Sequence, residues 1–124
     1  MSFAPIKIGK HEIKIPILQG GMGVGISWDG LAGAVSANGG LGIISAVGTG
    51  YYGDKKFAKN LSYGRPFGSE NFYSKEALFE IFKNARKVCG NAPLGVNILY
   101  AINDYGGVVR ESCEAGTDVI VTGA

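Results

Sequence analysis

Four short apolar segments alternate along the chain with stretches of helical spacing, and each helical stretch ends in glycine. The apolar segments are residues 13–18, 41–47, 92–100 and 117–124, and the helical stretches are residues 29–40, 74–90 and 103–116. Continuous apolar runs of this length are typical of strands buried on both faces of a parallel sheet. Strands that each follow a helix indicate right-handed crossovers between parallel neighbours. The sequence therefore predicts an α/β fold with four parallel strands.

The ends of the helical stretches carry residues that begin and end helices. Asp29, Ser74 and either Asn103 or Asp104 can cap the three amino ends, because their side chains accept hydrogen bonds from free backbone amides. Glycine follows the last helical residue of each stretch, as is common where helices end. These signals fix where we expect the helices to lie.

The segment of residues 48–74 begins with the pattern Gly48-x-Gly50-x-x-Gly53. We expect a long loop there with one short helix over residues 55–61, and long loops in compact domains are often functional lids. The pattern mimics the fingerprint of dinucleotide sites, in which glycines open a helix that faces the pyrophosphate. Polar sequence follows it here in place of an apolar helix, so we favour a chance match.

The composition predicts one small soluble domain and excludes several classes of protein. The chain has 124 residues, of which 46% are hydrophobic and 18% charged, enough for one core. Its net charge is +2, and the basic residues are scattered, so no nucleic-acid footprint is present. No secretory signal and no apolar run of membrane length occur. Cys89 and Cys113 fit no metal or redox spacing, and we expect two reduced, buried thiols in a cytoplasmic protein.

Glycine is over-represented, with 21 residues in 124, against an average share of about 7%. The densest cluster comprises Gly20, Gly21, Gly23 and Gly25, directly after the first predicted strand. Glycine loses more conformational entropy on folding than any other residue. Such a cluster therefore indicates either a sharp turn or a large group that lies against the backbone.

The carboxyl ends of the predicted strands carry only small, polar or glycine residues. In parallel α/β folds, ligands bind beyond these ends. The residues there are Gln19 to Gly23, Ser45, Gly48 to Gly50, Asn97, and Thr122 to Ala124. They form no acid pair, no His cluster and no Ser–His arrangement. Such an edge suits a flat cofactor that carries its own chemistry.

Four segments in order, PILQGGMG, LAGAVSANGGLGIIS, LGVNI and VIVTGA, resemble the nitronate monooxygenase family, formerly called 2-nitropropane dioxygenases. They also resemble the similar flavin-dependent enoyl-acyl-carrier-protein reductases. The motifs cover most of the chain apart from residues 48–74. The resemblance implies that residues 1–124 are one partial domain, the N-terminal portion (about four βα units) of an FMN-binding (β/α)8 TIM barrel.

The resemblance also implies which residues contact FMN. In the family, the turn after the first strand lies against the flavin ring, so the backbone of residues 21–23 (Gly21, Met22 and Gly23) is expected there. Asn97 matches a third-strand asparagine that hydrogen-bonds FMN, and Thr122 and Gly123 match the fourth-strand end beside the flavin. The family's catalytic His and its phosphate-gripping loops match no residue of this chain. Since half of the implied barrel is missing and two sheet edges would be uncovered, we expect the isolated chain to be poorly folded and inactive.

Each of these residues also has a purely structural interpretation. Met22 could fill the core, and Asn97 could hydrogen-bond only protein groups, as a buried amide must. We favour a flavin contact for both, and leave Gln19 and Thr122 open between structural and ligand roles. For the aromatic residues of the long loop, a small satellite core is favoured over a substrate pocket: Tyr51, Tyr52, Tyr63, Phe67, Phe72 and Tyr73.

Three functions fit these observations. The first is an FMN-dependent oxidoreductase that oxidises alkyl nitronates, with electrons passed to oxygen and a base supplied from outside this chain. The second is an enoyl-acyl-carrier-protein reductase that uses NAD(P)H and FMN. Gly20-Gly21 stands where many monooxygenases have Ala-Pro, as it does in the reductases, and this weakens a choice between the two activities. The third is a non-catalytic fragment. The expected partner is a small molecule, an alkyl nitronate or an enoyl thioester, with no nucleic acid or membrane; a homo-oligomer is left open.

Overall fold

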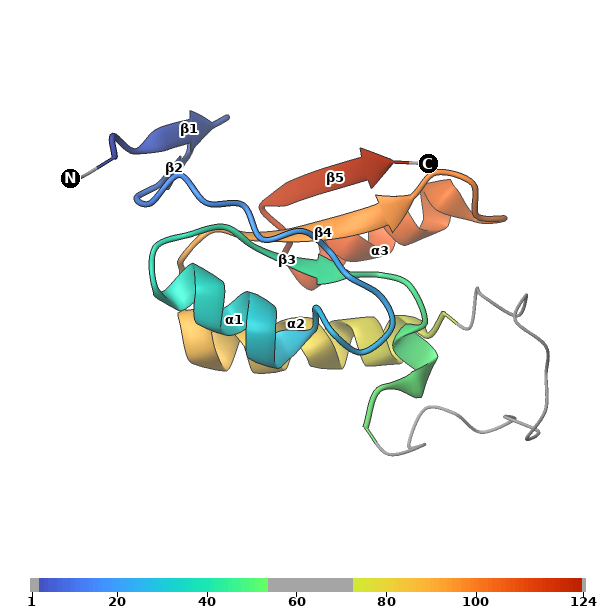
Figure 1. The fold of residues 1–124 in the computed structure, drawn as a ribbon. Coiled ribbons are helices and arrows are strands. Elements are labelled where there is room, and N and C mark those ends of the chain that lie inside the picture. Colours follow the sequence, from blue (N-terminus) through green and yellow to red (C-terminus); the bar gives the residue numbers. More distant parts are fainter. Residues whose placement is uncertain (1–2, 54–72, 124) are drawn as a thin grey trace.

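The computed structural model describes residues 3–53 and 73–123. A short antiparallel hairpin precedes a parallel three-stranded sheet with the order β3-β4-β5 (Figure 1). The strands are β1 (Ile6–Ile8), β2 (His11–Ile13), β3 (Gly42–Ser45), β4 (Leu94–Leu99) and β5 (Val119–Gly123). The helices are α1 (Asp29–Ala37), the short 3-10 helix η1 (Thr49–Tyr51), α2 (Lys75–Cys89) and α3 (Tyr105–Ala115). From α1 onward the predicted alternation of strands and helices is confirmed, but the parallel sheet of the described residues has three strands in place of the four predicted.

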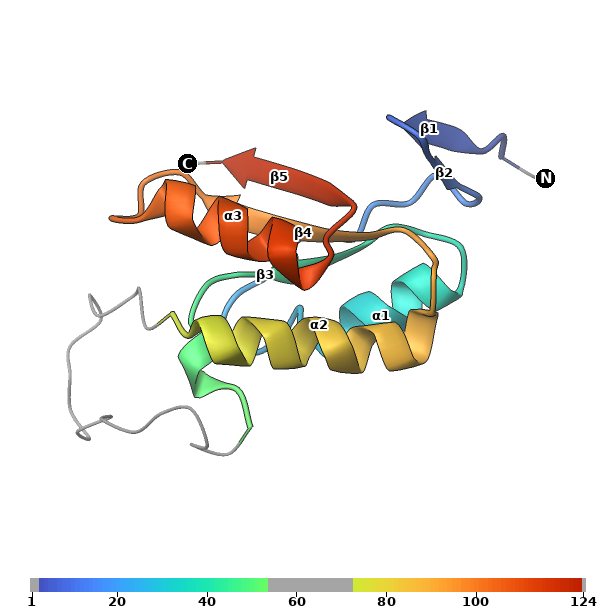
Figure 2. The same ribbon diagram turned by 180° about the vertical axis from the view of Figure 1, so that it is seen from behind.

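The three α-helices pack on one face of the parallel sheet, as Figure 2 shows from behind. Side chains that alternate along the strands point to opposite faces, and Ile44, Val96 and Ile98 lie on the helix side. There they pack in one buried cluster with Leu78 and Phe82 of α2. This cluster is the main core, and it leaves the opposite face of the sheet for other contacts.

The helix caps follow the sequence signals in two of three cases. The Ser74 side chain accepts a hydrogen bond from the Ala77 amide, and that of Asp104 accepts one from Gly107. The prediction that Asp29 caps the first helix is wrong, because Trp28 occupies that position and makes no side-chain cap. Asp29 instead lies in the first turn, where a negative charge is favourable beside the helix amino end.

The predicted first strand over residues 13–18 is wrong in extent. β2 ends at Ile13, and only Leu18 pairs with the sheet, through an isolated parallel bridge to Leu41. Pro16 lies between them and has no backbone N–H to donate to a ladder. The segment still follows the edge of β3, because Leu41 donates to the Ile17 carbonyl at 2.9 Å.

The hairpin of β1 and β2 was not predicted, and it fills the second face of the sheet at its amino end. Ile13 is buried there with Leu41 and Ile43, and Ile6 and Ile8 pack against them. Alternating apolar residues around Gly9, which has a φ of +58°, are the signal for such a hairpin. The loop of residues 19–27 lies at the carboxyl end of this face.

The long loop is described only at its two ends. Gly48 has a left-handed φ of +66° and leads into the short η1, so the Gly48–Gly53 pattern does not open an α-helix there. Thr49 is buried and bonds Ser74 at the start of α2 in both directions, with distances of 3.0 and 3.1 Å. The short helix expected over residues 55–61 lies outside the described residues.

The two cysteines differ in burial. Cys89 is buried as expected, but the prediction that Cys113 is buried is wrong. The buried residues of α3 are Gly107, Val108 and Ser112, so Cys113 falls on the outer surface of that helix.

Among residues 3–53 and 73–123, no helix has the length and apolar character needed to cross a membrane.

Candidate functional site

The glycine-rich loop of residues 19–27 lies against the carboxyl ends of β3 and β4. In Figure 1 the blue segment between β2 and α1 crosses in front of the sheet. A Cβ on Gly21 would lie 2.5 Å from the Cβ of Asn97, closer than real Cβ atoms approach. A Cβ on Gly23 would lie 3.2 Å from Val47 and 3.3 Å from the Ser45 hydroxyl. Glycine is therefore required here because the loop backbone touches the strand ends.

Asn97 joins this loop to the middle strand. Its Nδ2 donates to the Gly21 carbonyl at 3.2 Å, and the side chain is half-buried. The strand register places Asn97 between Ser45 and Val121, on the face away from the helices. Its Oδ1 has no hydrogen-bond partner in the described part of the chain. Asn97 thus has one structural bond and one acceptor available to a ligand.

Met22 is not a core residue. Its side chain is 48% exposed, on the surface formed by the glycine loop. Its backbone polar groups are used inside the loop: the N–H donates to the Ser27 hydroxyl at 2.8 Å, and the carbonyl accepts from the Ser27 amide at 3.0 Å. A ligand would therefore meet the Met22 side chain rather than its amide.

Gln19 and Ser27 hold the loop from beneath. The Gln19 carboxamide bonds the Gly20 carbonyl, the Ser27 hydroxyl and the amide of Ile43 in β3, so in this structure its polar atoms bond protein groups. Ser27 is fully buried. Sequence reasoning missed Ser27, since one serine between a glycine cluster and a tryptophan carries no pattern of its own.

Thr122 faces away from Asn97, whereas Gly123 pairs in register with Leu99 and lies on the same face of the sheet as Asn97. The Thr122 hydroxyl is 2.9 Å from that of Tyr105 in α3, and Thr122 pairs in register with Ile98 of the helix-side core. Its side chain therefore lies on the helix side, opposite to Asn97. Gly123 has open space where a Cβ would stand. Of the predicted site residues, the structure brings together residues 21–23 and Asn97.

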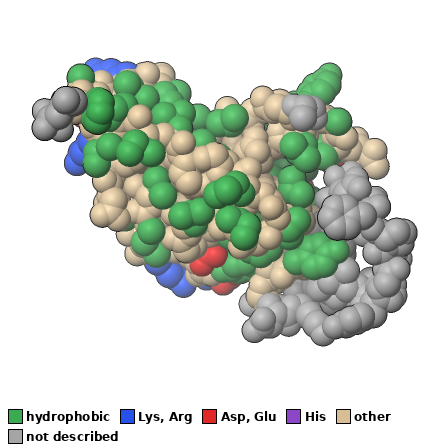
Figure 3. Space-filling view, viewed as in Figure 1, with side chains coloured by type: hydrophobic (Ala, Val, Ile, Leu, Met, Phe, Trp, Pro, Cys, Tyr) green, Lys and Arg blue, Asp and Glu red, His purple; other side chains and the backbone are tan. Residues whose placement is uncertain are grey.

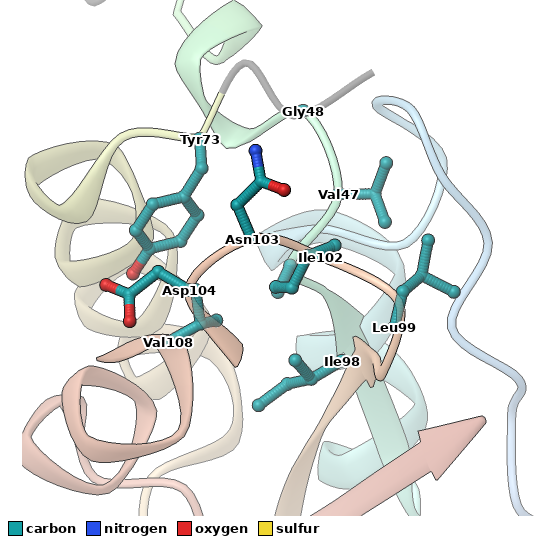
Figure 4. A pocket seen from close by; sticks show the side chains of 10 residues that line it. Val47, Gly48, Tyr73, Ile98, Leu99, Ile102, Asn103, Asp104 and Val108 are labelled. Atoms are coloured by element: carbon teal, nitrogen blue, oxygen red, sulfur yellow. The ribbon is translucent and has the colours of Figure 1, made fainter. Parts of the chain in front are cut away.

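A cavity of about 210 Å³ lies next to this cluster, at the carboxyl ends of β3 and β4 (Figure 4). Val47, which meets Gly23, is part of its wall. The other lining residues come mainly from the end of β4 and the start of α3: Ala46, Gly48, Tyr73, Ile98, Leu99, Ile102, Asn103, Asp104 and Val108. The wall is more apolar than polar, so the cavity suits an apolar group.

Tyr73 covers one side of the cavity and is tied to α3. Its hydroxyl donates to the Glu111 carboxylate at 2.6 Å. Burial and the hydrogen bond to this carboxylate raise the pKa of Tyr73 well above its ordinary value. Tyr73 thus lines a pocket. Tyr52 instead packs edge-on against Trp28, with ring centroids 5.5 Å apart. The prediction for Tyr63, Phe67 and Phe72 lies outside the described residues.

An apolar surface adjoins the glycine loop. The segment between β2 and α1 exposes large apolar side chains: Ile15, Ile17, Leu18, Met22, Val24 and Ile26. Hydrophobic side chains are widespread on the face of the molecule that Figure 3 shows. Within residues 3–53 and 73–123, no group of three or more His, Cys, Asp or Glu residues could bind a metal ion. The site thus offers glycine backbone, amide groups and apolar surface.

Comparisons with known proteins agree on one family and one fold. A family model described as nitronate monooxygenase matches residues 4–124. A structure of FabK from Thermotoga maritima is 27% identical with a TM-score of 0.58, and the match covers 88% of this chain and 27% of that chain. A mutant of the same protein gives 28% identity and a TM-score of 0.60, over 88% and 28%. No curated protein matches. The parallel sheet and its helices are thus part of a (β/α)8 barrel.

Proposed function

Because the chain belongs to the nitronate monooxygenase family, we propose that it forms the N-terminal part of an FMN-dependent oxidoreductase and supplies one wall of the flavin site. The chain spans about a quarter of the FabK structures that it matches. The observation that carries the proposal is the contact between the glycine loop and Asn97 at the carboxyl ends of the strands. Ligands of parallel α/β barrels bind at this end.

The residues present fit the flat ring of a flavin. Gly21 and Gly23 let the loop backbone lie directly on Asn97, Ser45 and Val47, and in this proposal the ring lies against that backbone. The Asn97 Oδ1 has no partner among the described residues and can accept a hydrogen bond from a ring N–H. The exposed Met22 side chain offers apolar contact. In this proposal Gly123 reaches the flavin only as backbone, and Thr122 stays on its hydrogen bond to Tyr105.

When bound, FMN would accept electrons from the substrate and pass them to oxygen. The residues of this chain bind and orient: Asn97 holds the ring edge, and the glycine loop with Val47 keeps water from that side. By family resemblance, the base and the phosphate grip come from outside this chain. The substrate proposed is an alkyl nitronate, in keeping with the family.

A second candidate is the reduction of an enoyl thioester with NAD(P)H. It is favoured by Gly20-Gly21, the pair that the resembling reductases also carry. The apolar cavity beside Val47 would accommodate part of an acyl chain. Both candidates need the same flavin wall, so the cofactor is tested first.

The cofactor test is retention of flavin. The whole proposed oxidoreductase, with this chain as its N-terminal part, is mixed with FMN, separated from free flavin by gel filtration, and its visible spectrum recorded. We expect a flavin absorption band in the protein peak, and its loss in the Asn97→Ala variant. A colourless wild-type peak would contradict the proposal and favour a non-catalytic role.

The substrate test is anaerobic reduction of the bound flavin. Bleaching by an alkyl nitronate without NAD(P)H is the expected result. Rapid bleaching by NAD(P)H and none by the nitronate would instead establish the second candidate.

A further inference from the structure

The hydroxyl of Ser27 organises the glycine loop from inside. Ser27 is fully buried, and its Oγ accepts from the Met22 amide and from Gln19 Nε2, both at 2.8 Å. It also donates to the Gly20 carbonyl at 3.1 Å. A hydroxyl has one donor and two acceptor positions. These three bonds use its whole capacity.

Gln19 attaches this arrangement to the sheet. Its Nε2 donates to the Gly20 carbonyl as well as to Ser27, and its Oε1 accepts from the Ile43 amide at 3.2 Å. A second attachment is made by the Ser45 amide, which donates to the Ser27 carbonyl at 2.8 Å. The loop is therefore attached to β3 through two backbone amides, those of Ile43 and Ser45.

These bonds decide which backbone groups of the loop stay available. The Gly20 carbonyl and both backbone polar groups of Met22 are used by Ser27. The Gly21 carbonyl is used by Asn97. Within the described residues, no acceptor is present for the N–H groups of Gly20, Gly21, Gly23, Val24, Gly25 and Ile26. Those of Gly21 and Gly23 lie on either side of Met22, next to the contact with Asn97.

We propose that Gln19 and Ser27 are positioning residues of the flavin site. They hold the Gly21 carbonyl on Asn97 and keep the N–H groups of Gly21 and Gly23 free for the ring. This inference rests on the proposed function for its ligand. The strength of the hydrogen bonds that Gln19 and Ser27 make in the loop can be measured without any flavin.

The first test is the Ser27→Ala variant with Ser36→Ala as its matched control. Ser36 is equally buried, and its hydroxyl donates to the Pro93 carbonyl at 2.7 Å and accepts from the Gly42 amide at 3.0 Å. It lies at the amino end of the sheet, so the control removes a comparable hydroxyl away from the loop. Amide hydrogen exchange at Met22 should speed up about tenfold in Ser27→Ala, as expected for one lost hydrogen bond. It should stay unchanged in Ser36→Ala.

The second measurement is the FMN dissociation constant by flavin fluorescence. We expect it to rise about tenfold in Ser27→Ala relative to Ser36→Ala, and in the same direction in Gln19→Met, which keeps the side-chain length but removes the amide. A merely structural role would move the thermal midpoints of both serine variants and leave their dissociation constants equal.

The outcomes separate the two claims. A wild-type protein that binds FMN, with equal dissociation constants in the two serine variants, would overturn the positioning role alone. A Met22 amide that exchanges freely in the wild type would also overturn it. A wild-type protein that does not bind FMN would overturn the proposed function, and with it the role of Gln19 and Ser27 in flavin binding.

Discussion

Gly21 and Asn97 are the residue pair on which the site depends. The amide of Asn97 needs a partner because it interrupts an apolar strand. The Gly21 carbonyl provides one only because no Cβ on Gly21 separates the loop from the strand. Asn97 Nδ2 thus has a structural partner, and the ligand contact of its Oδ1 stays a prediction. The sequence identified the pair, but not the contact between them.

A matched pair of adjacent glycines tests this contact. Gly21→Ala would place a Cβ 2.5 Å from Asn97, whereas Gly20→Ala meets nothing within 4 Å. We expect Gly21→Ala to weaken FMN binding by at least about tenfold, because the loop or Asn97 must shift. Gly20→Ala should stay within about twofold of the wild type. Equal dissociation constants for the two variants, measured by fluorescence titration, would mean that the contact has no part in binding.

Tyr73 gives a prediction for pH. Its pKa is raised in the folded protein by burial and by the hydrogen bond to Glu111, while in the unfolded chain it titrates near about 10. The folded state therefore keeps the proton longer, and the stabilisation is complete below about pH 10 and lost as the pH rises above it. The free energy of unfolding should fall more steeply above this pH in the wild type than in Tyr73→Phe, by up to about 1.4 kcal/mol per pH unit. Urea unfolding at several pH values measures both slopes, and parallel slopes would contradict the assignment.

At the scale of elements, α1 approaches β3 unusually closely. A Cβ on Gly42 would lie 1.9 Å from the Ala32 carbonyl oxygen of α1. Both atoms belong to the backbone, so neither can rotate away. Gly33 likewise brings α1 against α2, with its Cβ position 3.2 Å from the Ala85 carbonyl. Gly42 therefore sets the distance between α1 and the sheet, and Gly33 sets the distance between α1 and α2.

Two glycine variants test this packing in opposite directions. Gly42→Ala should lower the free energy of unfolding by roughly 1–3 kcal/mol or more, because the helix must move. Gly30→Ala lies in the first turn of α1 with nothing within 4 Å of its Cβ, and should raise that free energy by up to about 1 kcal/mol. Chemical unfolding measures both, and a neutral Gly42→Ala would contradict the close approach.

The sequence predicted the elements whose signals are local. Ser74 and Asp104 cap helices because the cap needs only a side chain and the next turn, and Gly116 ends α3 with a φ of +94°. The strand predicted over residues 13–18 is wrong because apolar character alone does not indicate strand pairing. Pro16 lacks the backbone N–H that a ladder needs. Ser27 was beyond reach, since its partners are defined by the path of a loop. The register that separates Thr122 from Asn97 likewise appears only in three dimensions.

At the scale of the whole molecule, the two ends of the sheet differ in character. The amino end is tied together around Asp118, whose carboxylate accepts from Arg86 at 2.8 Å and from the Leu94 amide at 3.0 Å. Arg86 also donates to the carbonyls of Ala92 and Gly116. His11 of the hairpin lies 3.8 Å from the other carboxylate oxygen. This end holds elements together, whereas the carboxyl end presents the glycine loop, Asn97 and the cavity.

The measurement that tests the central claim most directly is hydrogen exchange of the protein with and without FMN, and with riboflavin in place of FMN. Riboflavin has the same ring but no phosphate, and the proposed wall contacts the ring. We predict slower exchange in residues 19–24 and 95–99 with both ligands at saturation, and no change in the hairpin over residues 6–13. Protection confined to other segments, or protection by FMN but not by riboflavin, would contradict the claim that this chain forms the ring-binding wall of a flavin site.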